Sequence, residues 1–285
     1  MEIQTNLVSH GVSTCAGCAL ELILRHILQE LGKDTIIVIP PGCAALFSGL
    51  GNDTALRIPG FQGNLENSAA CAAGIRAGLD LQGKRDTTVL VLAGDGATVD
   101  IGLQSLSGML ERGDRVLYVC YDNEAYMNTG IQSSGSTPQG ARTTTTPGGK
   151  PTVQKDMLAF ASAHHIPYAA SASAGYLKDL RKKVKKARLA DGPTYIHVHT
   201  PCPTGWFFDP SQTVLLARQA VQTGAWPLVE IEYGAWHLNM PSRLKPVEQY
   251  LRSQGRFNHL SQVEIEEIQK QVQDHFDALK RICIE

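Results

Sequence analysis

The stretch from Thr87 to Thr129 constrains the fold more than any other part of the sequence. It opens with an apolar, β-branched run at 89–93 that stops in a Gly-Asp-Gly turn at Asp95, which is typical of a buried parallel strand. Leucine and methionine then recur at helical spacing, and a second apolar run at 116–121 leads to Asn123. This strand-helix-strand order predicts an α/β fold in which helices flank a parallel sheet.

The two strand ends carry oxygen-bearing side chains. Parallel strands end at the same edge of a sheet, so we expect Asp95 and Asn123 to lie close together. Carboxylate and amide oxygens, completed by phosphate oxygens and water, are the ligands that Mg²⁺ prefers. Taken alone, the Gly-Asp-Gly turn is equally compatible with an ordinary connection between a strand and a helix.

Composition narrows the class of protein. The 285 residues include 26 basic and 27 acidic side chains, and this near-neutral balance argues against nucleic-acid binding. No stretch reaches 18 apolar residues and the N-terminus lacks the pattern of a signal peptide, so we expect a cytoplasmic protein without a membrane span.

Strand and helix patterns alternate as far as Trp206. We therefore expect residues 1–206 to form the main domain and residues 207–285 an extension that packs on it, with an antiparallel addition at 228–233.

Four of the seven cysteines stand where a helix begins or a strand ends. Cys15 and Cys18 form a CxxC pair before an apolar-striped helix, while Cys43 and Cys202 each follow a strand that proline interrupts. In a reducing compartment such cysteines bind metal more often than they form disulfides. Four thiolates hold either zinc or a [4Fe–4S] cluster, and their spacing does not separate the two. The simplest alternative is that they are inert packing residues.

The other three cysteines are expected to be packing residues. Cys120 lies inside an apolar strand, Cys71 lies among the alanines of a helix, and Cys283 is near the C-terminus. A basic run at 182–186 is expected to form a solvated helix face. The alternative for that run is a docking patch for an acidic electron carrier such as ferredoxin.

A long Gly-, Ser- and Thr-rich loop runs from Asn128 to Pro151. Loops of this length are usually functional or disordered. Because the loop begins beside Asn123, we expect it to be a lid over substrate and cofactor. Within it, Arg142 either pairs with a substrate carboxylate or is a solvated loop residue.

The motif formed by the Gly-Asp-Gly turn and Asn123 resembles that of enzymes that use thiamine diphosphate. Its continuation, NEAYMNTGIQSSGSTPQGARTTTTPGGK, is similar to the β subunit of the 2-oxoacid:ferredoxin oxidoreductases, of which pyruvate:ferredoxin oxidoreductase is the best-known member. The resemblance extends from about Cys15 to Phe257 and includes the sequence CPTGW at 202–206. It implies the diphosphate-binding fold of thiamine diphosphate enzymes, with a C-terminal extension.

The resemblance also implies two cofactor sites. One holds thiamine diphosphate and Mg²⁺, and the other holds a proximal [4Fe–4S] cluster. The implied Mg²⁺ ligands are Asp95, Asn123 and the carbonyl group of Ala125, and the backbone groups of Gly94 and Gly96 bind the diphosphate. Asn128 is implied to face the reacting carbon of the cofactor. The implied cluster ligands are Cys15, Cys18, Cys43 and Cys202.

The implied activity is oxidative decarboxylation of a 2-oxoacid, with coenzyme A as acyl acceptor and ferredoxin as electron acceptor. Pyruvate is the expected substrate, and oxalate, a dianion that Arg142 would help to bind, and branched-chain 2-oxoacids are the alternatives. The resemblance places the catalytic glutamate on a pyrimidine-binding α subunit, so Glu66 is expected to be structural. A ferredoxin-like subunit with further clusters would complete the complex.

Two other interpretations remain open. A non-redox half of a thiamine-dependent decarboxylase or synthase would keep Asp95 and Asn123, but would have no need for four convergent thiolates. A non-catalytic α/β scaffold that binds zinc would keep the cysteines, but would have no need for the Mg²⁺ pair.

Overall fold

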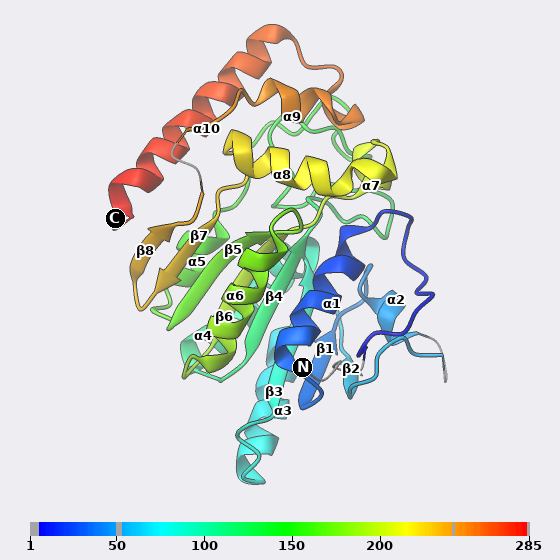
Figure 1. Cartoon of the computed structure of the whole chain (residues 1–285), viewed down its shortest axis with the longest axis vertical. Coiled ribbons are helices and arrows are strands. Elements are labelled where there is room, and N and C mark those ends of the chain that lie inside the picture. Colours follow the sequence, from blue (N-terminus) through cyan, green and yellow to red (C-terminus); the bar gives the residue numbers. More distant parts are fainter. Residues whose placement is uncertain (1–5, 50–52, 241–242, 284–285) are drawn as a thin grey trace.

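An eight-stranded sheet forms the centre of the molecule, as seen in the computed structural model (Figure 1). The structure describes residues 6–49, 53–240 and 243–283. The strands, in sheet order, are β2 (Gly60–Gln62), β1 (Thr35–Ile39), β3 (Thr88–Gly94), β4 (Leu117–Asp122), β6 (Thr194–His199), β5 (Tyr168–Ser173), β7 (Val229–Glu232) and β8 (Ala235–Leu238). The first six strands are mutually parallel, and β7 is antiparallel to both neighbours. The predicted parallel α/β sheet is confirmed.

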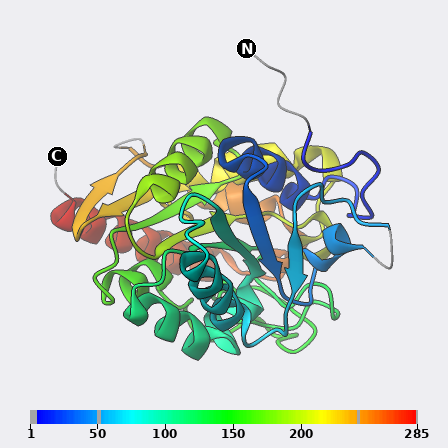
Figure 2. The same ribbon diagram turned by 90° about the horizontal axis from the view of Figure 1, so that it is seen from below.

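Helices cover both faces of the sheet, as the view from below shows (Figure 2). α1 (Ala19–Leu31) and α6 (Leu177–Leu189) pack on one face, and α3 (Ser68–Leu81), α4 (Leu103–Arg112) and α5 (Met157–Ser162) pack on the other. Side chains alternate between the two faces, and helices cover both faces, so every residue of β4, β5 and β6 is buried. Burial on both sides explains why these strands read as continuous apolar runs.

A third group of helices lies beyond the carboxyl ends of the parallel strands (Figure 1). It has its own apolar core, which Trp206, Leu216, Tyr250 and Phe257 help to form. The elements of this region are α7 (Pro203–Trp206), the 3₁₀ turn η2 (Pro210–Gln212), α8 (Thr213–Thr223), α9 (Glu248–Arg252), the 3₁₀ turn η3 (Gly255–Phe257) and α10 (Gln262–Ile282). In the described part of the chain, no helix combines the length and apolar character needed to span a membrane.

The segment after Trp206 is more regular than its sequence suggests. The antiparallel addition predicted at 228–233 is confirmed as β7, which joins the main sheet through β5. α8 was not predicted, although Leu216 and Ala220 recur at helical spacing and Gly224 ends the helix in a left-handed conformation. The division into a main domain at 1–206 and an extension at 207–285 stays a prediction.

Helix α5 begins later than the sequence pattern predicts. The sequence pattern predicts a helix around residues 153–163, but α5 starts at Met157. Asp156 is its N-cap, because its carboxylate accepts a hydrogen bond of 2.9 Å from the Ala159 N–H. The three residues before this cap, 153–155, belong to no helix or strand, and Lys155 Nζ donates to the Val99 carbonyl group.

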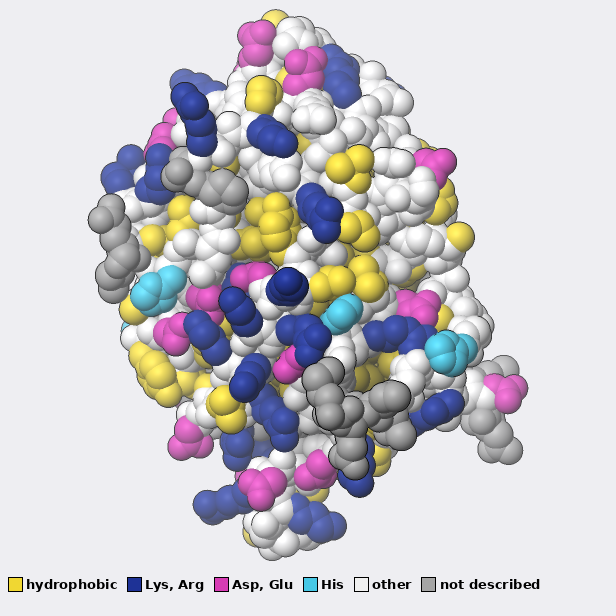
Figure 3. Space-filling model, in the orientation of Figure 1, with side chains coloured by type: hydrophobic (Ala, Val, Ile, Leu, Met, Phe, Trp, Pro, Cys, Tyr) yellow, Lys and Arg dark blue, Asp and Glu magenta, His cyan; other side chains and the backbone are white. Residues whose placement is uncertain are grey.

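The basic run at 182–186 is only partly a solvated face. Basic side chains do gather over α6 on the surface (Figure 3), and Lys182 and Lys185 are exposed. Lys183, however, is fully buried, with Nζ 2.7 Å from Asp179 Oδ2 and 2.8 Å from the Ser171 carbonyl oxygen. The prediction of a wholly solvated face is therefore wrong at Lys183, which ties α6 to the end of β5.

We predict that Lys183→Met lowers the free energy of unfolding by about 1–3 kcal/mol, because Asp179 and the Ser171 carbonyl group lose a buried donor. Urea unfolding followed by circular dichroism measures the change. Lys185→Met on the exposed side of α6 is the control and should alter stability by less than about 0.5 kcal/mol. Equal stability of the two variants would contradict the prediction.

Candidate active site

Three oxygen ligands for a metal ion meet at the carboxyl ends of β3 and β4. Gly94 and Tyr121 are paired neighbours on these strands, so the residues that follow them lie side by side. One terminal atom of the Asn123 amide is 3.0 Å from Asp95 Oδ1 and 2.9 Å from the Ala125 carbonyl oxygen. In the structure that atom is the amide oxygen, so three acceptors face one another with no hydrogen atom between them.

This spacing fits a magnesium ion. Adjacent ligands of an octahedral Mg²⁺, each about 2.0–2.1 Å from the metal, lie about 2.9 Å from one another. Rotating the Asn123 amide by half a turn would place its nitrogen between Asp95 and Ala125, where it would donate to both oxygens in the absence of metal. The sequence-predicted ligands are therefore brought together in a geometry that suits the predicted ion.

The electrostatics of Asp95 point the same way. The residue is buried, and burial together with the charge of Asp122 raises the pKa of its carboxyl group well above the usual value. Its described hydrogen-bond partner from another segment is Ser134, whose hydroxyl donates over 2.6 Å. A divalent cation at this point would offset the repulsion between the carboxylates.

Fixed hydrogen bonds hold the turn that carries the ligands. Asp122 Oδ1 accepts from the Glu124 N–H at 2.7 Å, and Glu124 adopts a left-handed conformation with φ of 63°. The Trp206 indole donates to the Asn123 carbonyl oxygen at 2.8 Å, and the Thr137 hydroxyl donates to the Glu124 carbonyl oxygen at 2.6 Å. Such bonds offset the cost of an unusual backbone conformation and preorganise the ligands.

A buried ion pair links this turn to the C-terminal segment. The Arg256 guanidinium donates to the Glu124 carboxylate and stacks on the Trp206 ring with 3.7 Å between its central carbon and the ring centroid. Burial raises the pKa of Glu124 to about 7, although the charge of Arg256 acts in the opposite direction. Sequence reasoning missed this pair, since nothing in the local pattern joins residues so far apart in the chain.

The chain after Asp95 does not enter α4 directly. Residues Gly96–Asp100 form a π-helical turn, in which the Ile101 N–H reaches the Gly96 carbonyl oxygen. The Tyr126 ring lies against this turn, and its hydroxyl donates to the Gly96 carbonyl oxygen at 3.2 Å. A Cβ atom on Gly96 would come within 2.3 Å of that ring, so the close approach requires glycine.

The loop predicted as a lid is ordered. It is anchored beside the turn at residues 122–125 that carries two of the candidate Mg²⁺ ligands (the metal turn). Lys150 is buried, and its Nζ donates to the carbonyl oxygens of Ser134 (3.0 Å) and Thr137 (2.7 Å). Both of those residues also touch the metal turn through their hydroxyl groups. Asn128 and Arg142 are exposed on the same loop, so their predicted contacts with cofactor and substrate stay predictions.

The four candidate cluster cysteines lie close enough to affect one another's ionisation. The charges of Cys202, Cys18 and Cys15 all act on the Cys43 thiol and, after burial, raise its pKa to about 12. Burial and the charges of Cys202 and Cys15 raise the pKa of Cys18 to about 11. Thiols that repel one another's negative charge become good ligands once a cation or an iron–sulfur cluster lies between them.

Helix starts and a tight turn position these thiols. Cys18 is the N-cap of α1, and Cys202 is the N-cap of α7, where its sulfur accepts from the Gly205 N–H at 3.4 Å. The Thr213 hydroxyl donates to the Gly17 carbonyl oxygen at 2.7 Å and so ties the CxxC turn to the segment after Cys202. All four thiols are free. Within the described ranges, no three His, Cys, Asp or Glu side chains are arranged to hold a single metal ion.

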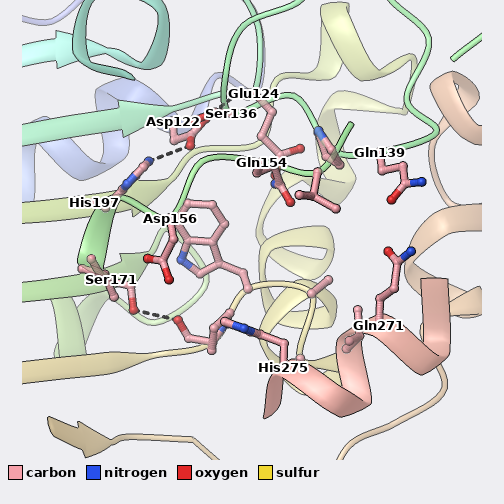
Figure 4. A pocket seen from close by; sticks show the side chains of 18 of the residues that line it. Asp122, Glu124, Ser136, Gln139, Gln154, Asp156, Ser171, His197, Gln271 and His275 are labelled. Carbon is pink, nitrogen blue, oxygen red and sulfur yellow. Dashed lines mark hydrogen bonds and ion pairs between the residues drawn. The ribbon is translucent and has the colours of Figure 1, made fainter. Parts of the chain in front are cut away.

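A cavity of about 440 Å³ lies behind the metal turn, between the sheet and α10 (Figure 4). At one end Asp122 and His197 face each other, with 2.6 Å between Oδ2 and Nε2, and His275 of α10 lies across the cavity. Asp122 thereby holds both His197 and the Glu124 N–H. Sequence reasoning did not predict this cavity, whose lining includes neither Asp95 nor any of the four candidate cluster cysteines.

Comparison with known proteins identifies the class of this site. The family described as thiamine pyrophosphate enzyme, C-terminal TPP binding domain, matches residues 42–198, which include both strand ends that carry the metal ligands. Fold and site together therefore define a thiamine diphosphate-binding domain.

Relatives along the whole chain are more specific. The chain is 46% identical to pyruvate synthase subunit PorB of Methanothermobacter thermautotrophicus, over 97% of this chain and 96% of that protein. It is 44% identical to ketoisovalerate oxidoreductase subunit VorB of Pyrococcus abyssi, over 96% of this chain and 92% of that protein. The chain belongs to the family of 2-oxoacid:ferredoxin oxidoreductase β subunits, which confirms the resemblance seen in the sequence.

The fold agrees with that family. The 2-oxoglutarate:ferredoxin oxidoreductase from Magnetococcus marinus matches with a TM-score of 0.62 over 76% of this chain and 81% of that chain, at 22% sequence identity. At this identity the match bears on the fold alone.

We predict that Arg256→Met destabilises the protein by about 3–5 kcal/mol, because it leaves the buried Glu124 carboxylate without its partner. Chemical unfolding measures the loss. The double variant Arg256→Met/Glu124→Gln should recover part of it by removing the uncompensated charge. Arg252→Met, at an exposed arginine of the same segment, is the control, and an equal effect of both single variants would contradict the prediction.

Proposed function

We propose that this chain is the thiamine diphosphate-binding subunit of a complex that oxidatively decarboxylates pyruvate, with coenzyme A as acyl acceptor. Electrons pass through a [4Fe–4S] cluster on this chain toward ferredoxin. One observation supports this most directly: β1 and β6, which lead to Cys43 and Cys202, flank β3 and β4, which lead to Asp95 and Asn123, in the parallel part of the sheet. A candidate cofactor site and a candidate cluster site at one edge of the sheet suit a reaction in which electrons leave the organic cofactor for a nearby acceptor.

Residues of this chain hold the cofactor in the proposal. Asp95, Asn123 and the Ala125 carbonyl group would hold Mg²⁺, and the backbone N–H groups of Gly94 and Gly96 would contribute to the site for the diphosphate. Bound thiamine diphosphate supplies the chemistry that cleaves the bond between the carboxylate and carbonyl carbons of a 2-oxoacid. Hydrogen bonds from Arg256, Trp206 and Thr137 to Asn123 and Glu124 keep the metal turn rigid.

The cysteines distinguish the proposal from its alternatives. A non-redox thiamine enzyme has no use for four convergent thiols, and a zinc scaffold has no use for the oxygen ligands of Asp95 and Asn123. Both sets occur in this chain. Thiolates of Cys15, Cys18, Cys43 and Cys202 would hold the cluster.

The partners in the proposal follow from the resemblance to the family. A pyrimidine-binding α subunit supplies the catalytic glutamate, and a ferredoxin-like subunit carries electrons onward. The relatives PorB and VorB are themselves named as subunits, which supports an assembly of several chains.

Pyruvate is the first choice of substrate, because PorB, a pyruvate synthase subunit, is similar over nearly the whole chain. A branched-chain 2-oxoacid is the second choice, since VorB of a ketoisovalerate oxidoreductase is almost as similar. Oxalate would require a second cationic contact, for which Arg142 is the candidate on the exposed loop.

Anaerobic purification of the native complex tests the proposal. Iron, zinc and thiamine diphosphate are quantified, and reduction of a low-potential acceptor is compared for pyruvate, ketoisovalerate and oxalate, each with and without coenzyme A. Pyruvate oxidation that requires coenzyme A is expected. Faster turnover of ketoisovalerate or of oxalate would overturn the substrate, and zinc in place of iron would overturn the redox function.

We predict that Asp95→Ala lowers retention of thiamine diphosphate by about 100-fold or more while leaving the iron content unchanged. The reason is that Asp95 supplies a metal ligand but no cluster ligand. Thiamine and iron analysis of the same sample measures both quantities. An equal loss of iron would show that the two sites are not separable.

Cys202→Ser should have the opposite effect. We expect it to remove the cluster, a loss of about four iron atoms per chain, while thiamine diphosphate stays bound. Cys120→Ser is a matched control, because Cys120 is buried in the core among apolar residues and away from the other four thiols. Full iron content in the Cys202→Ser protein would rule out Cys202 as a ligand.

A further inference from the structure

Tyr121 lies between the two proposed cofactor sites. It is near the end of β4, directly before Asp122 and Asn123, and its side chain is 2% exposed. Its hydroxyl oxygen accepts a buried hydrogen bond of 3.1 Å from the N–H of Ala44, the residue after Cys43. One end of this side chain therefore touches the loop of a candidate cluster ligand.

The ring of Tyr121 touches the other site. A Cβ atom placed on Gly94 would lie 3.2 Å from Cε2, Cζ and the hydroxyl oxygen of Tyr121, so the ring packs directly on the Gly-Asp-Gly turn. On the opposite side, a Cβ atom on Gly42 would lie 3.3 Å from the same hydroxyl oxygen. Larger residues at either glycine would push the ring or the loop aside.

The electrostatics agree with this position. Burial raises the pKa of Tyr121 well above its ordinary value, and the charges of Cys43 and Asp95 add to the effect. Backbone pairing of Tyr121 with Gly94 in the sheet fixes its height relative to the turn.

Resting on the proposed function, we infer that Tyr121 is a positioning residue that sets the separation between the iron–sulfur cluster and thiamine diphosphate. Its hydroxyl holds the backbone beside Cys43, and its ring holds that loop at a fixed distance from Gly94. Tyr121 itself is neither oxidised nor reduced. This separation is the one that electrons from the proposed 2-oxoacid oxidation would cross to reach the cluster.

The reduction potential of the cluster provides a test, because a merely structural role of Tyr121 would not change this potential. Tyr121→Phe keeps the ring but removes the acceptor of the Ala44 N–H, which is then free to donate to a cluster sulfur. Hydrogen bonds to cluster sulfurs tune the potential, and an added donor stabilises the more negative, reduced state. In the purified complex without substrate, an EPR-monitored titration should therefore give a more positive potential at full iron content.

Removing the ring tests the spacing. Tyr121→Leu should slow the arrival of electrons at the cluster in a single turnover by about tenfold or more, because displacements of about 1 Å change such rates strongly. Tyr168→Phe is the matched control, since Tyr168 packs on the same face of the sheet but bonds to Glu230, far from both loops. It should alter neither quantity.

Different results separate this inference from the function on which it rests. If the purified complex contains zinc in place of iron, the cluster is not on this chain, and the proposed function fails. If the cluster is present, two results would overturn the role of Tyr121. One is a cluster potential in Tyr121→Phe that is unchanged or more negative, and the other is a normal rate of cluster reduction in Tyr121→Leu.

Discussion

Three carboxylates that are buried close to one another in space govern this structure. Asp95, Asp122 and Glu124 meet where β3 and β4 end, and their mutual repulsion in a water-poor environment would destabilise the fold if it were not compensated. Each is met by a different partner: the Ser134 hydroxyl, the His197 imidazole and the Arg256 guanidinium. A divalent cation at Asp95 would complete the compensation, so the stability of this region and the capacity to bind a diphosphate have the same physical origin.

The compensation draws on distant parts of the chain. Arg256 and Trp206 come from the region beyond the sheet, while Lys150 fixes the long loop that carries Ser134 and Thr137. The C-terminal segment therefore does more than cover the sheet edge, because it supplies the only arginine that the structure pairs with Glu124 in its described part. The same region brings Cys202 toward Cys15, Cys18 and Cys43, so one set of packing contacts shapes both candidate sites.

Much of the fold and of the candidate site follows from local patterns. Apolar runs that stop at Asp95 and Asn123 predict the two strands, their parallel order and the meeting of both side chains, because parallel strands end at one edge. Local patterns fail where the context is non-local. Lys183 looks solvated beside Lys182 and Lys185, but it is buried and donates to the Ser171 carbonyl group of β5. Before α5, Lys155 donates to the Val99 carbonyl group, which is distant in the sequence.

The sequence by itself determined the α/β class, the family, the oxygen ligands at the ends of β3 and β4, and the four cysteines at helix starts and strand ends. Tertiary structure alone decided the pairing of Glu124 with Arg256, the cavity beside His197 and the place of Tyr121 between Ala44 and Gly94. The reason is physical: periodicity and turn residues record interactions within a few positions of the chain, whereas a buried ion pair or an aromatic spacer depends on which distant segments the packed core brings together.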